Sequence, residues 1–262
     1  MDMKHSLALI LALLLSGCSW FENKEDPANL SASKLFSDAM EDMDDSNYEQ
    51  AIKKFETLES RYPYGRYAEQ AQLEVAYAYY KQEDVPSATA ACDRFIKLHP
   101  THPNVDYAYY LKGLANFNEN LGIIAKLGGQ DITERDPKQA RESYDAFREL
   151  VTRFPNSKYA EDSAARARFL LNGLANYELQ VARYYMKRKA YVAAVNRAQY
   201  VVKNYQQTPS TEQALLIMIQ AYDALGMTDL RNDAESVMKH NFPNSKYLSG
   251  SADSGKAWWK LW

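Results

Sequence analysis

The sequence has 262 residues and a formal net charge of −3, with 31 basic and 34 acidic side chains mixed along its length. This balance excludes a protein that binds nucleic acid through a strongly basic surface. Only two cysteines are present, Cys18 and Cys92, so a framework of disulfides is also excluded. Tyrosine dominates the aromatic residues, with 20 against nine phenylalanines and four tryptophans, and it suits half-buried grooves because its ring packs while its hydroxyl stays hydrated.

Residues 1–17 have the pattern of a secretory signal peptide. Lys4 and His5 precede an apolar stretch at residues 7–15, and small residues follow at Ser16 and Gly17. A span of the bilayer needs about 20 apolar residues, so this stretch is too short to cross it. We expect residues 1–17 to be removed on export.

Cys18 directly follows this signal. Leu15-Ser16-Gly17-Cys18 resembles the lipobox of bacterial lipoproteins, in which the cysteine becomes the new N-terminus and carries acyl chains. Each buried CH₂ contributes about 0.8 kcal/mol, so several chains give stable anchoring. Ser19 in place of an aspartate favours the outer membrane. The sequence therefore predicts a lipid anchor at Cys18, on the periplasmic face of that membrane, followed by a linker to residue 30.

Five later segments repeat one pattern and end at or near Pro63, Pro100, Pro155, Pro209 and Pro243. Small, large and apolar residues precede the prolines at fixed helical spacing. In order, these residues are Ala51, Phe55 and Leu58; Ala88, Cys92 and Phe95; Ser143, Phe147 and Leu150; and Ala194, Ala198 and Val201. In the fifth segment this count meets Arg231 and Glu235, so we expect the register to shift onto Leu230, Ala234 and Val237.

A second helical stretch precedes each segment, and a proline stops each pair because its ring clashes with the preceding turn. The pattern resembles the tetratricopeptide repeat (TPR), a pair of helices of about 34 residues. We therefore expect an all-α superhelical solenoid of about five repeats, with an insertion at residues 121–136 and one long helix over residues 159–189. The repeats are residues 31–63, 66–100 and 104–155 in an N-terminal part (31–155), and 158–209 and 210–243 in a C-terminal part (156–243).

No catalytic motif interrupts the repeats. The sequence has no GxSxG, HExxH or phosphate-binding loop. His99 and His102 lack a nearby third ligand for a metal. Cys92 is expected to be a small buried hydrophobe. We therefore expect no enzyme, no metal and no cofactor besides the lipid on Cys18.

Tyrosines gather around the motif RYPYGRY, between the first and second repeats. One interpretation places them in the repeat core. The other makes them a groove for an extended peptide, with an arginine available for a carbonyl or carboxylate. The candidate groove residues are Tyr62, Tyr64, Tyr67, Tyr79, Tyr80 and Arg94.

Two further features could contact a partner. Arg197 interrupts a helix of small residues; it is either a solvent-facing side chain or part of a docking surface. The tail at residues 244–262 carries three of the four tryptophans. These are expected to contact the chain, a partner or the membrane interface, and one hypothesis places them in the tyrosine groove.

Four strings carry a family resemblance: RYPYGRYAEQAQLEVAYAYYK, FIKLHPTHPNVDYAYYLKG, RDPKQAR and RFPNSKYAEDSA. With the lipobox and the repeats, the chain resembles the BamD (YfiO/ComL-type) outer-membrane lipoproteins of the β-barrel assembly machinery, over most of residues 18–243. THPN and RDPKQAR are far more specific than the repeat pattern.

The resemblance implies a periplasmic scaffold that helps fold and insert outer-membrane proteins. In the family, N-terminal repeats recognise unfolded barrel substrates. C-terminal repeats contact the periplasmic POTRA domains of the barrel subunit BamA, together with BamC and other Bam lipoproteins. Arg197 becomes a candidate BamA contact because the string VNR matches there. The rival hypothesis is a TPR lipoprotein that coordinates peptidoglycan synthesis or hydrolysis enzymes, which generic repeats would suit equally.

Overall fold

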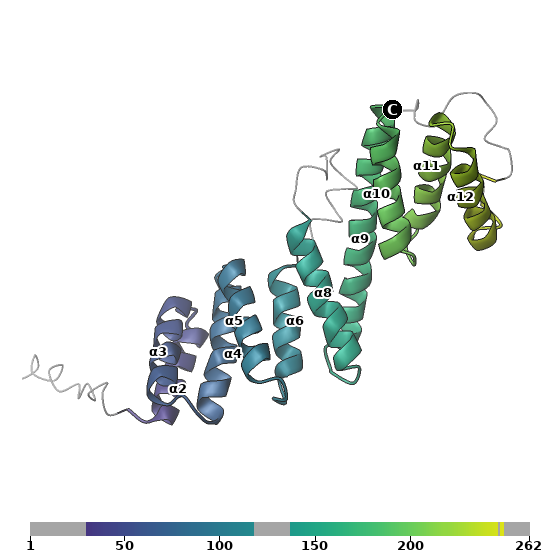
Figure 1. Ribbon diagram of the computed structural model, residues 1–262. Coiled ribbons are helices and arrows are strands. Elements are labelled where there is room, and N and C mark those ends of the chain that lie inside the picture. The colour runs from purple at the N-terminus through teal and green to yellow at the C-terminus, as the bar shows by residue number, and fades with distance from the viewer. Residues whose placement is uncertain (1–29, 118–136, 246, 249–262) are drawn as a thin grey trace, which may run out of the picture. The chain divides into compact units, whose positions relative to one another are not determined.

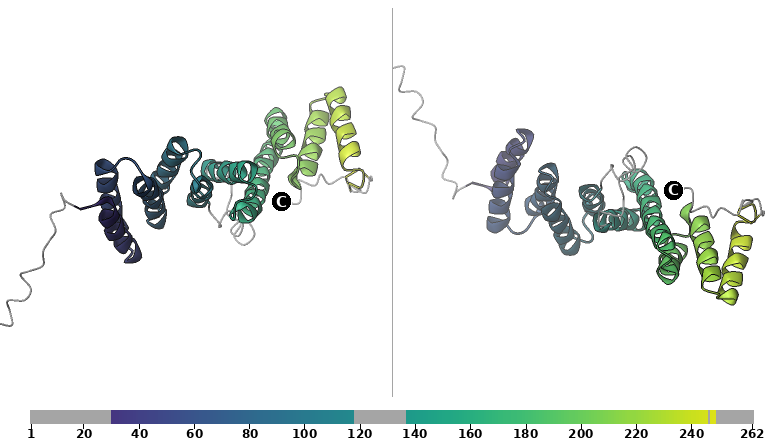
Figure 2. Two further views of the ribbon diagram at one scale, coloured as in Figure 1. Left: turned by 90° about the horizontal axis from the view of Figure 1, so that it is seen from below. Right: turned by 90° about the horizontal axis from the view of Figure 1, so that it is seen from above.

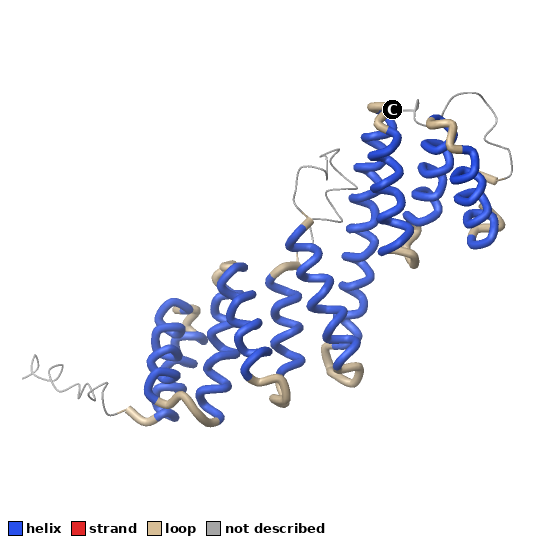
Figure 3. The backbone as a smooth tube through the Cα atoms, in the orientation of Figure 1, coloured by secondary structure: helices blue, strands red, loops and turns tan. Residues whose placement is uncertain are grey.

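The computed structural model describes residues 30–117, 137–245 and 247–248. Within these ranges the regular structure is entirely α-helical (Figure 3), which confirms the predicted all-α class. The helices are α2 (Ala32–Asp44), α3 (Tyr48–Arg61), α4 (Arg66–Lys81), α5 (Val85–Leu98), α6 (Val105–Ala115), α8 (Lys138–Arg153), α9 (Ala160–Lys187), α10 (Tyr191–Asn204), α11 (Ser210–Ala224) and α12 (Thr228–Asn241). None of the helices described here is long and apolar enough to cross a membrane. The signal peptide, Cys18, the insertion at 121–136 and residues 249–262 lie outside these ranges.

The chain forms two compact units, Met1–Ala78 and Tyr79–Trp262. In the first unit, α2 packs against α3. In the second unit, each helix from α5 to α12 packs against the next one, and α9 also packs against α11 (Figure 1). Packing of consecutive helices is the arrangement of a TPR-like solenoid.

The second helix of every repeat ends in the same way. The residues that follow these helices have φ between −131° and −127°. Each donates its backbone N–H to the carbonyl four residues earlier, at 2.8 Å. These C-cap residues are Tyr62, His99, Phe154, Tyr205 and Phe242, and a proline follows four of them directly. These prolines marked the helix ends in the sequence because a proline cannot continue a helix.

The repeated small, large and apolar positions form the core of the helix pairs. All twelve residues predicted for the first four repeats have no exposed surface. Cys92 is among them and fills the position that Phe55 and Phe147 occupy in the neighbouring repeats. The prediction that it is a small buried hydrophobe is therefore confirmed.

Serine occupies the small position of the third repeat for a local reason. Its neighbour helix α6 approaches so closely at Gly113 that an added Cβ would lie 2.5 Å from the ring of Phe147. The hydroxyl of Ser143 donates to the Gly113 carbonyl at 2.8 Å. Because Gly113 and Ser143 are both small, the backbone of α6 packs directly against side chains of α8.

The long helix predicted over residues 159–189 is confirmed as α9, which has 28 residues. The expected register shift in the fifth repeat is confirmed at Ala234, which is buried, and is wrong at Leu230 and Val237, which are 41% and 44% exposed. Met238, at the unshifted position, is buried instead of Val237. The shared C-cap fixes α12 in the unshifted register.

Arg231 and Glu235 therefore occupy the positions that are small and large in the other repeats. Figure 2 shows α12 beside α11 alone among the described helices. Because no later described helix covers these positions, they carry ion pairs with Asp223 at 3.0 Å and Lys239 at 2.9 Å. A polar outer face is typical of the terminal repeat of a solenoid.

Candidate functional site

The tyrosines of RYPYGRY surround the beginning of α2. The hydroxyl of Tyr62 donates to the carbonyl of Leu30 at 3.0 Å. Tyr67, in the first turn of α4, donates to the hydroxyl of Ser33 at 3.2 Å, and its ring lies 5.6 Å from that of Phe36. Tyr62 and Tyr67 thus tie the turn between the first two repeats to Leu30 and Ser33, at the start of the described residues. These two rings contact the chain while remaining at the surface, so the core interpretation does not describe them fully, and the peptide groove stays a prediction.

Tyr64 lies between them and is 91% exposed. The next residue, Gly65, has φ of +99°, a backbone conformation that side chains with a Cβ rarely adopt. The turn therefore presents the Tyr64 ring to solvent on a backbone whose flanks are held by Tyr62 and Tyr67. Tyrosine is among the residue types enriched at the sites that contribute most to binding at protein interfaces.

Arg66 adds a positive charge to the same surface. Its guanidinium lies 4.9 Å from the centre of the Tyr67 ring and donates to the Tyr67 hydroxyl at 3.2 Å. The hydrogen bond with Ser33, and then the bond from Arg66, lower the pKa of the Tyr67 phenol below its ordinary value. The sequence reasoning chose Arg94 as the cation of the groove and missed Arg66, although Arg66 lies within the same motif.

Tyr79, Tyr80 and Arg94 belong to the second unit. The two tyrosines are half-buried in the last turn of α4, at the opposite end of that helix from Tyr67. Arg94 is exposed on α5. The structure therefore brings three of the six predicted groove residues together at one end of the first unit, and it places the other three in the second unit.

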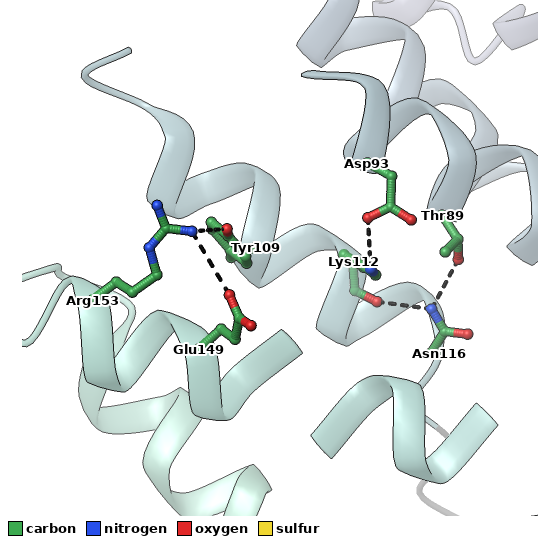
Figure 4. A network of polar contacts seen from close by, with 7 residues as sticks. All are labelled: Thr89, Asp93, Tyr109, Lys112, Asn116, Glu149 and Arg153. Atoms are coloured by element: carbon green, nitrogen blue, oxygen red, sulfur yellow. Dashed lines mark hydrogen bonds and ion pairs between the residues drawn. The ribbon is translucent and has the colours of Figure 1, made fainter. Parts of the chain in front are cut away.

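A polar network fixes α5 against α6 next to Arg94 (Figure 4). The Lys112 ammonium lies 2.6 Å from the carboxylate of Asp93, and the Asn116 amide donates to the Thr89 hydroxyl at 2.8 Å. On the other side of α6, Arg153 of α8 donates to the Tyr109 hydroxyl and lies 3.7 Å from Glu149. Polar side chains on both faces of α6 thus set its position between α5 and α8.

Arg197 lies on α10 and is tied to the interior of its own unit. Its guanidinium lies 3.0 Å from the carboxylate of Glu178 on α9. The Glu178 side chain is only 4% exposed, whereas that of Arg197 is about half-exposed. Arg197 is therefore both an internal partner of a buried charge and a surface cation.

Arg141 on α8 completes this cluster. It lies 4.0 Å from the other oxygen of Glu178 and donates to the hydroxyl of Tyr200 at 2.9 Å. The Tyr200 ring contacts that of Tyr205, whose pKa burial raises to about 12. Two arginines against one carboxylate give this cluster of three side chains from α8, α9 and α10 a formal charge of +1.

Sequence reasoning missed Glu178, although a signal was present. Glu178 stands between Leu174 and Ala182, at the spacing of four that places all three on the buried face of α9. A carboxylate on such a face requires a cation or a donor nearby. The same argument predicts such a group on a neighbouring helix, and Arg197 on α10 is that group.

Packing accounts for the side chains of His99, His102 and Cys92, which could otherwise bind a metal or act as a nucleophile. Within them, no three His, Cys, Asp or Glu side chains are arranged to hold a metal ion. The rings of His99 and His102 pack against Phe95, at 5.0 and 5.2 Å between ring centres. Burial raises the pKa of the Cys92 thiol to about 12, so it is not a nucleophile at neutral pH. The surfaces above are suited to binding.

Comparison with known proteins gives a family match. The model of the YfiO family, described as outer membrane lipoprotein, matches residues 28–238. A Neisseria meningitidis serogroup A protein named outer membrane protein assembly factor BamD is 46% identical and covers 99% of both chains. Proteins of the same name from Vibrio cholerae and Xylella fastidiosa (strain Temecula1) are 38% and 36% identical, over 90% and 94% of this chain.

Proposed function

The chain belongs to the YfiO family of outer membrane lipoproteins, and from this premise we propose that it acts as a non-enzymatic scaffold in the assembly of outer membrane proteins. The relatives' shared name, outer membrane protein assembly factor, supports this role. Three parts of the chain would divide the work: an anchor, a surface for unfolded substrates and a surface for partner subunits.

Cys18 would supply the anchor. Acyl chains on this cysteine hold the repeats at the periplasmic face of the outer membrane, which raises their effective concentration near the barrel subunit. Residues 19–29 then connect the lipid to α2.

The N-terminal surface formed by Tyr62, Tyr64, Arg66 and Tyr67 would receive unfolded barrel segments. An extended barrel strand exposes amide groups and alternating aromatic side chains, and Tyr64 offers a ring against which such a side chain packs. Arg66 offers a cation for a carbonyl or terminal carboxylate. The observation that carries this proposal is the nearly complete exposure of Tyr64 between two tyrosines that are bonded to the chain. Tyr79, Tyr80 and Arg94 would form a separate candidate surface within the second unit.

The C-terminal repeats would hold the partner subunits. Arg141 and Arg197 present a net positive surface over the buried Glu178, which suits an acidic patch on a periplasmic POTRA domain of a BamA-like subunit. A BamC-like lipoprotein and further Bam lipoproteins would bind to the same repeats.

A peptide-binding measurement tests the substrate surface. A labelled peptide with the C-terminal strand of an outer-membrane barrel protein is titrated with the full chain carrying Cys18→Ser. Tyr64→Ala should weaken binding about tenfold or more, which is the usual effect of removing a central aromatic anchor. Tyr184→Ala, which removes another exposed tyrosine on α9, serves as the control and should leave the affinity unchanged.

Equal affinities for all three chains would reject the tyrosine surface.

Affinity capture of the acylated chain from native membranes distinguishes assembly of outer membrane proteins from the rival role in peptidoglycan metabolism. A large barrel protein among the captured partners supports assembly, whereas peptidoglycan synthases or hydrolases without a barrel partner support the rival.

A further inference from the structure

Besides the charged positions Arg231 and Glu235, the exposed surface of α12 carries an apolar stripe. It is formed by Leu230 and Val237, with Met227 at its N-terminal end. All three side chains are substantially exposed. Leu230 and Val237 are seven residues apart and therefore lie on one face of the helix, two turns from each other.

No other described repeat has two large aliphatic side chains at the same positions. These positions lie twelve and five residues before the C-cap residue of each second helix. In α3, α5 and α8 they are Gln50 and Thr57, Ser87 and Arg94, and Glu142 and Glu149. In α10 they are Ala193 and Tyr200, and the Tyr200 hydroxyl accepts a hydrogen bond from Arg141. Two exposed aliphatic side chains at these positions are thus peculiar to the last helix among the described repeats.

Acidic side chains border the stripe. Asp233 lies three residues after Leu230 and four before Val237, so it is a neighbour of both on the helix surface. Asp229 lies one turn before Asp233. Neither aspartate pairs with a cation in the part of the chain that the structure describes. The surface therefore suits an apolar segment that also carries positive charges.

We propose that residues 256–262 of the same chain, KAWWKLW, cover this stripe. Their tryptophans would pack on Leu230 and Val237, and Lys256 and Lys260 would face Asp229 and Asp233. Leu248 packs against the C-terminal core, and the eight residues from there to Lys256 reach about 26 Å when extended. The whole of α12 is about 21 Å long, so the segment can reach the stripe. It would close the end of the solenoid and compete with any partner that docks on α12.

Tryptophan fluorescence tests the proposal in the full chain. All four tryptophans, Trp20, Trp258, Trp259 and Trp262, lie outside the described residues. The chain with Cys18→Ser and Trp20→Phe keeps only the three in the proposed segment as reporters. Acrylamide quenching is measured for this chain, for variants with Leu230→Ser or Val237→Ser added, and for the isolated peptide 249–262.

In the chain whose stripe is unchanged, we expect the three tryptophans to be protected from acrylamide relative to those of the isolated peptide. Either serine variant should lower the docking equilibrium about tenfold and move the quenching towards that of the peptide. Val192→Ser, which changes another exposed valine on α10, serves as the matched control and should leave the protection intact.

Three results would overturn the proposal. Quenching equal to that of the peptide in every chain would leave the stripe to a partner protein. Protection that survives both serine variants would place the segment elsewhere, for example against the N-terminal tyrosines. Protection that disappears on dilution would assign the stripe to a second copy of the chain.

Discussion

The carboxylate of Glu178 is buried on α9, and the guanidinium of Arg197 on α10 approaches it to 3.0 Å. A buried carboxylate is costly unless cations or donors surround it. Arg197 and Arg141 supply these cations. The guanidinium of Arg197 is therefore held by a contact within its own unit. The arginine that the family resemblance indicates as a partner contact is also a structural residue.

Arg197→Ala should therefore lower the free energy of unfolding. It leaves Glu178 with only the longer contact to Arg141, and an unsatisfied buried polar group costs about 1–3 kcal/mol. Glu178→Gln in the same chain removes the charge that needs a partner, so the double variant should regain part of this loss. Urea unfolding of the single and double variants measures this coupling. Additive effects of the two changes would contradict the account.

The same double variant separates the two roles of Arg197 in binding. If Arg197→Ala weakens binding to a BamA-like POTRA domain only by disturbing the fold, adding Glu178→Gln should restore the affinity. If the guanidinium contacts the partner directly, the affinity should remain low in the stabilised double variant. Isothermal titration with the purified POTRA domains measures both outcomes.

Two glycines in helices should respond in opposite ways to alanine. At Gly113 the new Cβ would overlap the Phe147 ring, and overpacking of a core costs about 1–3 kcal/mol. At Gly173, in α9, no atom lies within 4 Å of the new Cβ, so Gly173→Ala should stabilise the protein by about 0.5–1 kcal/mol. Urea unfolding of both variants tests the pair. Stabilisation of equal size at both sites would mean that α6 and α8 do not approach closely at Gly113.

The sequence predicted the fold largely through two local rules. Proline cannot continue a helix beyond its first turn, so Pro63, Pro100, Pro155 and Pro243 marked helix ends without knowledge of the tertiary structure. Small and large residues at fixed spacing then identified the buried face, and all twelve residues chosen in the first four repeats are buried. Both rules depend on a single helix and its spacing, which a sequence displays directly.

The residues that the sequence misplaced depend on what lies across from them. Apolarity favoured Leu230 and Val237 as core residues, but the core on that side needs a following helix, and no described helix follows α12. Glu178 was missed although it lies on the buried face of its helix, because its partner Arg197 is 19 residues away on another helix. The groove residues were chosen by their proximity in sequence, whereas the structure divides them between two units.

Cys92 should be inert in the folded protein. Its pKa of about 12 results first from burial, and only the thiolate reacts with iodoacetamide. In the chain with Cys18→Ser, Cys92 is the only thiol. At pH 8 it should remain unmodified in buffer and react fully in denaturing urea, as intact mass would show. Rapid labelling in buffer would mean that α5 opens to solvent.

The same raised pKa links stability to pH. A cysteine in the unfolded chain has a pKa of about 8.5, so above that value the unfolded state has released its proton while the folded state retains it. The contribution of Cys92 is fully present below pH 8.5 and is lost as the pH rises towards 12, at up to about 1.4 kcal/mol per pH unit. Cys92→Ala lowers stability at every pH through the cavity that it leaves, but it removes this slope. Urea unfolding between pH 8 and 11 should therefore show the stabilities of the two chains converging, while Tyr205 contributes equally to both. Parallel curves would show that Cys92 titrates alike in the folded and unfolded states, which burial on α5 does not allow.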